Sequence, residues 1–317
     1  MRSCIDEVQK ISGWSEELKR LWDANPGSLK IIITGSSALL VDKGLSEALT
    51  GRFELIAVEH WNLSEAQRIF GAALREFIEY GCYPGAQRFL RGKDGASIER
   101  WASYVRDSIV EPTLGRDLLL LTKVEHPALL RQVFGVASSL PSEIISLQKL
   151  QGQLQGRGSL PTIRNYLKLL GGCFLVSGLD KYSPRLLRLR SSAPKLIVHD
   201  NGLMRAFERP VTAPLSSERF GRYFENCIGA RFIEAGWDTY YWKDRDREVD
   251  FVVIGPNGEK WAIEVKSSLI KEKDLASLRA FCAQFADFEP CLISLEQQTF
   301  SGIRTLDVEE ILSLHRN

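Results

Sequence analysis

One stretch of twenty residues, 247–266, constrains the fold more than any other part of the chain. Two segments with alternating apolar residues flank the turn sequence Gly-Pro-Asn-Gly, which predicts a β-hairpin. If the turn is centred on Asn257, Asp250 lies directly across from Glu264, and Lys266 shares their face. A slip of one residue would mix polar and apolar faces, so the pattern favours the centred turn. The opposite face then carries an apolar surface formed by Phe251, Val253, Trp261, Ile263 and Val265.

The three polar side chains of this hairpin predict a cation site. Two neighbouring carboxylates repel each other unless a cation lies between them, so we expect Asp250 and Glu264 to bind Mg²⁺ or Mn²⁺. Such a cation activates water and stabilises the charge that develops on a phosphoryl group, and Lys266 would position the attacking water. The alternative is a trio of salt-bridged side chains at the end of a sheet, without chemistry.

The first quarter of the chain predicts part of a parallel sheet. A short apolar strand ends at Asp6 and Glu7, and a helix with apolar spacing follows at residues 14–22. Residues 29–36 form an apolar run that predicts a second, buried strand. A third strand is predicted at residues 53–58. Strands that alternate with helices in this way are typical of a doubly wound sheet.

Polar residues at the ends of these strands predict a phosphate site. Ligands of doubly wound sheets bind at the carboxyl ends of the strands, where Asp6, Glu7 and Ser36 fall. Asp6 would hold Mg²⁺, and Glu7 would orient a water on a γ-phosphate. The alternative is a charge pair at a helix N-terminus, which the helix dipole stabilises.

Residues 142–183 have the spacing of a helix-turn-helix followed by a wing. A helix at 146–154 is followed by a glycine-rich turn, and Pro161 opens a second helix. Basic side chains on and after the second helix form a candidate phosphate-contacting surface for DNA. The alternative is the docking of another domain or protein. The basic residues are Arg164 and Lys168 on the second helix and, near the wing, Lys181, Arg185, Arg188, Arg190 and Lys195.

The N-terminal stretches and the hairpin also carry a resemblance when they are considered together. The stretches are residues 5–10, 32–40 and 43–52, and the hairpin has the form Asp-x13-Glu-x-Lys. This combination resembles the bacterial and archaeal AAA-type ATPases whose C-terminal part is a domain of unknown function. That part is similar to the PD-(D/E)xK nuclease-like fold. The resemblance extends from Ile5 to about Ser267.

The resemblance implies roles for individual residues. Asp6 and Glu7 match the Walker B motif, Ser36 matches the sensor, and Arg52 matches an arginine finger. In the C-terminal part Glu225 matches the acid that this fold carries on an upstream helix, and it joins Asp250 and Glu264 as a metal ligand, with Lys266 beside them. The implied cofactors are Mg²⁺ and, for the full-length family form, ATP.

The sequence departs from the family in one respect. The Walker A loop has the form Gly-x4-Gly-Lys-Ser/Thr, because backbone N–H groups and the lysine bind the phosphates. These 317 residues contain no such sequence, since Gly92-Lys93 is followed by Asp94 and has Gln87 at the position of the first glycine. Family members carry the loop upstream of the acidic pair. We therefore expect that this chain is truncated and does not bind or hydrolyse ATP by itself.

Composition narrows the class of protein. The net charge is +1, so binding to nucleic acid requires a local basic patch. Six scattered cysteines form no Cys-x2-Cys pair, and the four histidines are dispersed and predict no metal site. The chain contains no apolar segment that predicts a membrane span or a signal peptide, so we expect a cytoplasmic protein.

These observations predict an α/β protein. The expected parts are a partial P-loop-type parallel sheet (1–75), a helical segment (76–140), a winged-helix-like segment (141–190) and a C-terminal restriction-endonuclease-like α/β domain (191–317). Three functions remain open: an ATPase of this family linked to nucleic acid or a partner, a metal-dependent nuclease, and a non-enzymatic binding protein. The expected partners are DNA, another protein or a second copy of the chain.

Overall fold

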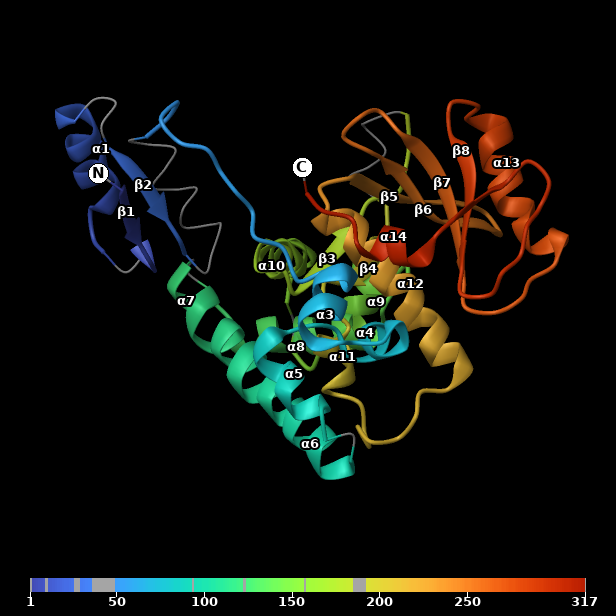
Figure 1. The fold of residues 1–317 in the computed structure, drawn as a ribbon, viewed down its shortest axis with the longest axis horizontal. Coiled ribbons are helices and arrows are strands. Elements are labelled where there is room, and N and C mark those ends of the chain that lie inside the picture. Colours follow the sequence, from blue (N-terminus) through green and yellow to red (C-terminus); the bar gives the residue numbers. More distant parts are fainter. Residues whose placement is uncertain are drawn as a thin grey trace.

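The N-terminal unit is a small parallel α/β element. The computed structural model describes residues 2–8, 11–25, 29–35, 49–92, 94–121, 124–156, 158–184 and 192–316. Strand β1 (Arg2–Ile5) pairs in parallel with β2 (Lys30–Ile33), and helix α1 (Trp14–Ala24) connects them. Leu18 and Leu49 are buried against the sheet. The predicted strand, helix and second strand are therefore confirmed, but β2 is not buried as predicted, since Ile32 is 64% exposed. The unit lies apart from the C-terminal sheet (Figure 1).

The predicted third strand at residues 53–58 was wrong. This segment is neither strand nor helix, and Ile56 and Val58 are 76% and 85% exposed. An alternating pattern gives a strand only where a neighbouring strand supplies backbone partners and a core covers one face. Within the described residues neither is present here.

Helices form the centre of the molecule. Asn62 begins the first of them with a capping box, in which its side chain accepts from Glu65 N and the Glu65 carboxylate accepts from Asn62 N. Two π-helical segments continue directly from α6 and lead into α7. The elements are α3 (Leu63–Phe70), α4 (Leu74–Tyr80), α5 (Pro84–Leu90), α6 (Gly95–Tyr104), the π-helical Val105–Val110 and Thr113–Asp117, and α7 (Leu118–Leu121).

Three further helices precede a small antiparallel sheet. These are α8 (Pro127–Ser139), α9 (Leu147–Gly152) and α10 (Leu160–Gly172), and the strands are β3 (Val176–Leu179) and β4 (Lys195–Val198). Ile144 makes an isolated antiparallel bridge to the first residue of β4. Helix α10 buries the apolar residues that its spacing predicted, which are Ile163, Tyr166, Leu167 and Leu170.

The C-terminal part is a five-stranded mixed sheet between helices. Strands β5, β6 and β7 are antiparallel, whereas β7, β8 and β9 are parallel. Helix α12 packs on one face and α13 on the other. The elements are α11 (Gly202–Arg205), α12 (Ser217–Glu234), β5 (Asp238–Asp244), β6 (Arg247–Ile254), β7 (Lys260–Lys266), the 3-10 turn Glu272–Leu275, α13 (Ala276–Gln284), β8 (Glu289–Ser294), β9 (Arg304–Leu306) and α14 (Val308–Leu312).

The β6–β7 hairpin has the predicted register. Phe251 pairs with Ile263 and Val253 with Trp261, as a turn centred on Asn257 requires. All the residues of the predicted apolar face pack in the main core, with Trp261 partly buried. That core is a single cluster whose residues come from both the helical centre and the C-terminal sheet, from Leu63 to Leu312. The two parts therefore stabilise each other. The overall class is α/β, as predicted, and none of the helices in the described residues is long and apolar enough to cross a membrane.

Candidate functional site

A β-bulge in β6 sets the position of Asp250. Between the pairs Tyr240–Val252 and Trp242–Val249, β6 contains one residue more than β5. Val249 and Val252 consequently pack in the same apolar cluster beneath α13, although strict alternation would separate them. Such a bulge redirects the side chain at its centre. Asp250 therefore reaches lysines that arrive from two different strands.

The predicted residues of the hairpin lie together. The Lys266 ammonium is 2.6 Å from Glu264 Oε1 and 3.8 Å from Asp250 Oδ2. The same Asp250 oxygen accepts a hydrogen bond from Val265 N at 2.9 Å. Both carboxylates are buried, and Glu264 Oε2 has no hydrogen-bond partner. A buried carboxylate oxygen without a partner is costly unless a further group binds it.

The assignment of Lys195 to the basic surface near the wing was wrong, because this side chain is buried in the acidic site. Lys195 is fully buried in β4, and its ammonium lies 2.6 Å from Glu225 Oε1 and 3.8 Å from Asp250 Oδ1. It also donates to the Asp250 carbonyl at 3.1 Å. Glu225 comes from α12 and meets the hairpin residue Asp250 through their shared partner Lys195. The signal that could have revealed Lys195 is a lysine that opens the apolar strand Lys-Leu-Ile-Val.

Burial is the main cause of the raised pKa values of the two glutamates. Burial raises the pKa of Glu264 to about 8; the Asp250 carboxylate adds to this rise and the Lys266 ammonium opposes it. Burial also raises the pKa of Glu225 to about 7, against the attraction of Lys195. Burial by itself lowers the pKa of Lys195 and of Lys266, but the surrounding carboxylates outweigh it and raise both. At neutral pH Glu225 is therefore partly protonated and Glu264 largely so, while both lysines are charged.

This donor set fits a divalent cation. Carboxylate oxygens are the ligands that Mg²⁺ and Mn²⁺ prefer, and the partnerless Glu264 Oε2 supplies a free coordinating atom. Asp250 and Glu264 would hold the ion, with Glu225 beside them.

The pKa of Glu264 predicts how stability depends on pH. An ordinary glutamate has a pKa of 4.5. Between pH 4.5 and about pH 8, the Glu264 carboxyl therefore keeps its proton in the folded protein and loses it in the unfolded chain. The free energy of unfolding of the metal-free protein should therefore fall as pH rises from 5 to 8, by an amount on the order of 3 kcal/mol. Thermal unfolding at several pH values measures this. Glu264→Gln should flatten the dependence, and an unchanged slope would contradict the assignment.

The structure brings only some of the predicted phosphate-site residues of the N-terminal unit together. Asp6 Oδ1 accepts hydrogen bonds from Thr34 Oγ1 and from Glu7 N, so the acidic pair lies beside the end of β2. Arg52 forms an ion pair with Asp23 of α1, at 3.7 Å between Nε and Oδ1. Ser36 lies outside the described residues.

The structure describes the predicted basic surface only in part. Arg164 and Lys168 are exposed on α10 and line a cavity of about 500 Å³ together with residues of α9 and with Ser192. Both also attract Asp180, whose pKa burial raises and these two cations lower. Arg185 and Arg188 lie outside the described residues.

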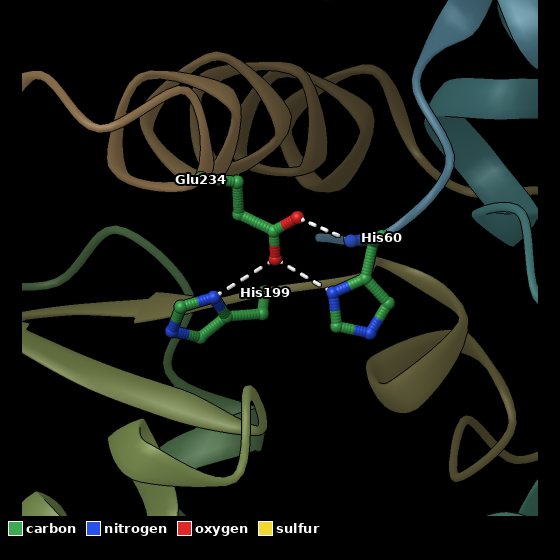
Figure 2. A group of neighbouring side chains, drawn as sticks. All are labelled: His60, His199 and Glu234. Carbon is green, nitrogen blue, oxygen red and sulfur yellow. Dashed lines mark hydrogen bonds and ion pairs between the residues drawn. The ribbon is translucent and has the colours of Figure 1, made fainter. Parts of the chain in front are cut away.

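The expectation that the histidines are dispersed was wrong for two of them. His60 and His199 lie on either side of Glu234, and each directs its Nδ1 at the same carboxylate oxygen, at 2.6 and 3.0 Å (Figure 2). No sequence spacing pointed to this cluster, because His60 and Glu234 are 174 positions apart.

Comparison with known families divides the chain into three matches. Residues 2–67 match an AAA domain, residues 71–213 a domain of unknown function (DUF8612), and residues 220–313 a second domain of unknown function (DUF4143). They support an AAA-type protein with domains of unknown function. The match at residues 2–67 supports the predicted AAA-type character of the N-terminal unit.

Two relatives and one solved structure are similar along much of the chain. An uncharacterized protein of Methanocaldococcus jannaschii is 23% identical, over 96% of this chain and 70% of its own length. An uncharacterized protein of Haemophilus influenzae is 24% identical, over 78% of this chain and 61% of its own length. A chain from an assembly of Thermococcus gammatolerans McrB AAA+ hexamers with bound McrC aligns over 99% of this chain and 98% of its own, at 11% identity. Its TM-score of 0.30 is too low to bear on the fold.

Proposed function

We propose that the C-terminal part of this AAA-type protein is a nuclease-like domain of the PD-(D/E)xK type that cleaves DNA with Mg²⁺ or Mn²⁺. The observation that carries the proposal is the convergence of Asp250, Glu264 and Lys266 at one end of the hairpin, with a buried Glu264 oxygen left without a partner. The order of α12, three antiparallel strands, α13 and a parallel strand around this hairpin supports it.

The side chains divide the work of phosphodiester hydrolysis. Asp250 and Glu264 would hold the divalent cation, which when bound supplies Lewis-acid stabilisation of the phosphoryl charge. Lys266, whose ammonium lies 2.6 Å from Glu264 Oε1, would donate a hydrogen bond to the attacking water beside the cation. Glu225 has a pKa of about 7, so it can accept the proton of that water at neutral pH. Lys195 holds Glu225 in place.

The test of this function is a cleavage assay. The purified chain should nick supercoiled plasmid DNA in Mg²⁺ or Mn²⁺, and a chelator should stop the reaction. Absence of nicking with either metal, by a folded protein that binds DNA, would remove the nuclease proposal.

DNA would be held by the segment that includes α8, α9, α10, β3 and β4. Three helices followed by an antiparallel pair of strands, with the bridge from Ile144 as an additional strand position, support a winged-helix arrangement. In such an arrangement α10 is the recognition helix. Its exposed Arg164 and Lys168 face outward beside the cavity described above, and Arg185 and Arg188 would extend the same surface.

The basic surface predicts a change in the salt dependence of binding. The double variant Arg164→Ala/Lys168→Ala should bind a DNA duplex more weakly, and the slope of log affinity against log salt should become shallower by about 1 to 2 units, because two phosphate contacts are lost. Fluorescence anisotropy at several salt concentrations measures the slope. The charge-matched control is Arg91→Ala/Arg100→Ala, on exposed positions of the helical segment. If the two double variants give the same slope of log affinity against log salt, Arg164 and Lys168 do not contact phosphates in particular. This face would then dock a protein instead.

A second candidate function is non-catalytic binding. Lys195 supports it, because its ammonium already lies 2.6 Å from Glu225 and 3.8 Å from Asp250. A lysine so placed neutralises part of the charge that would attract a metal ion. DNA binding with the predicted salt dependence, but without cleavage in any divalent metal, would favour this function.

For the N-terminal unit we propose a part in ATP hydrolysis by the longer family form in the cytoplasm. Asp6 and Glu7 would act as the Walker B pair, Ser36 as the sensor and Arg52 as the arginine finger. The contact of Asp6 with Thr34 supports this, because it places the acidic pair beside the strand that leads to Ser36. No phosphate-binding loop is present in this sequence, so no step of ATP hydrolysis is assigned to this chain alone. Self-association or a protein partner would accompany the AAA-type function.

A further inference from the structure

A second polar cluster lies away from the nuclease-like site. His60 comes from the segment that precedes α3, His199 follows β4, and Glu234 ends α12 (Figure 2). One donor atom from each side chain lies within 4.8 Å of the others. His199 and Glu234 are buried and His60 is largely so. Three potential ligands therefore converge in a part of the protein that the proposed nuclease chemistry does not use.

The two oxygens of Glu234 have different surroundings. Oε2 accepts from His60 N at 2.8 Å and lies 3.6 Å from the Arg231 guanidinium. Arg231 is itself paired with Glu59 at 2.8 Å, which balances its charge. Oε1 faces both imidazole rings, through His60 Nδ1 and His199 Nδ1. The protein thus fixes the carboxylate by one oxygen and presents the other to two ring nitrogens.

Hydroxyl groups fix the far side of each ring. His60 Nε2 is 2.9 Å from Tyr83 OH, and His199 Nε2 is 2.8 Å from Ser177 Oγ. Metal-binding histidines generally have their second nitrogen held by a polar group in this way, which sets the tautomer and aims the first nitrogen. Both rings here have that support, and both Nδ1 atoms point to Glu234 Oε1.

There is also room for a fourth ligand. A small cavity of about 30 Å³ adjoins the three side chains and is lined by Asp200 and Cys227 as well. A volume of that size holds about one water molecule. Sites with three protein ligands and one open position filled by water are common for zinc, and two histidines with one glutamate is a known ligand set.

We propose that His60, His199 and Glu234 bind a divalent transition-metal ion of the zinc class. Imidazole nitrogens favour such ions over Mg²⁺, which prefers oxygen ligands only. Each ligand comes from a different family match, namely 2–67, 71–213 and 220–313. The ion would therefore fasten the segment that leads out of the AAA-type unit to the two domains of unknown function. The proposal is independent of nuclease activity, because it uses none of the hairpin residues.

The test measures metal binding by the full chain with Glu264→Gln as background, so that the hairpin site does not contribute. This protein should bind one equivalent of Zn²⁺, and Co²⁺ should give the visible absorption of a low-coordinate site with nitrogen ligands. Adding His199→Gln should abolish both signals. Adding His126→Gln, at an exposed histidine before α8, should leave them unchanged.

Two further measurements test the proposal even if the His199→Gln variant does not fold. Zn²⁺ should raise the melting temperature of the folded background protein, because a ligand that binds only the native state stabilises it. Ser177→Ala keeps all three ligands and removes only the support of one ring, so it should weaken Zn²⁺ binding by about 10- to 100-fold. If the folded background protein neither binds Zn²⁺ or Co²⁺ nor gains thermal stability, the cluster is a hydrogen-bonded network only, and the proposal is overturned. Binding that Ser177→Ala and His199→Gln leave intact would also overturn it.

Discussion

Asp250→Asn should lower magnesium-dependent DNA cleavage by about 10³-fold, equivalent to about 4 kcal/mol of transition-state stabilisation. The substitution removes the negative charge that would hold the cation, while one oxygen remains to accept from Val265 N. The fold should therefore persist. Single-turnover cleavage of a labelled duplex, with DNA affinity measured separately, distinguishes loss of chemistry from loss of binding.

The matched control for this experiment is Asp246→Asn. Asp246 is exposed in the turn between β5 and β6, so its charge differs from that of Asp250 in position only. Cleavage by Asp246→Asn should equal that of the unaltered protein. If Asp250→Asn also cleaves at the full rate, the activity resides elsewhere and the hairpin is a structural salt-bridge cluster.

The second large effect is expected on stability. Lys195→Met should reduce the free energy of unfolding by about 3 to 5 kcal/mol, because removal of one partner leaves buried carboxylates without compensating charge. Lys195 is fully buried and contacts both Glu225 and Asp250. Denaturant unfolding measures the loss. It should be larger at pH 8 than at pH 5.5, since Glu225, with a pKa of about 7, is mostly neutral at the lower pH.

Two comparisons make this result specific. Lys260→Met removes an ion pair with Asp287 at the surface of the protein, and it should leave the free energy of unfolding nearly unchanged, because water screens such a pair. The double variant Lys195→Met/Glu225→Gln should recover part of the loss, because the charge left unpaired is also removed. A loss below 1 kcal/mol for Lys195→Met, or no recovery in the double variant, would show that the ammonium does not neutralise the site.

The hairpin could be predicted because local rules determine it. Alternation fixes which side chains share a face, and the turn sequence fixes the register, so the pairing of Phe251 with Ile263 followed from residues close in sequence. The bulge in β6 was not predictable in this way. It depends on how β5 pairs with β6, and it redirects Asp250 without a local sequence signal.

The remaining features depend on contacts between distant segments. Lys195 was visible as a charged residue in an apolar strand, but its partners lie 30 and 55 positions further along the chain at Glu225 and Asp250. His60 and Glu234 gave no signal at all, because nothing in their spacing indicates proximity. The segment at 53–58 shows the reverse case, in which a local strand pattern was present but the described fold provides no strand to pair with it.

The position of Lys195 bears on how this protein can be divided for experiments. The family matches place a boundary between residues 213 and 220, whereas the ammonium that neutralises Glu225 and Asp250 comes from β4, on the other side of that boundary. A fragment that begins at residue 220 would keep the three acids and Lys266 but lose the Lys195 ammonium that pairs with Glu225 and Asp250. The family match that begins at residue 220 therefore leaves out a lysine that neutralises part of the acidic site. Fragments of this protein should begin upstream of β4.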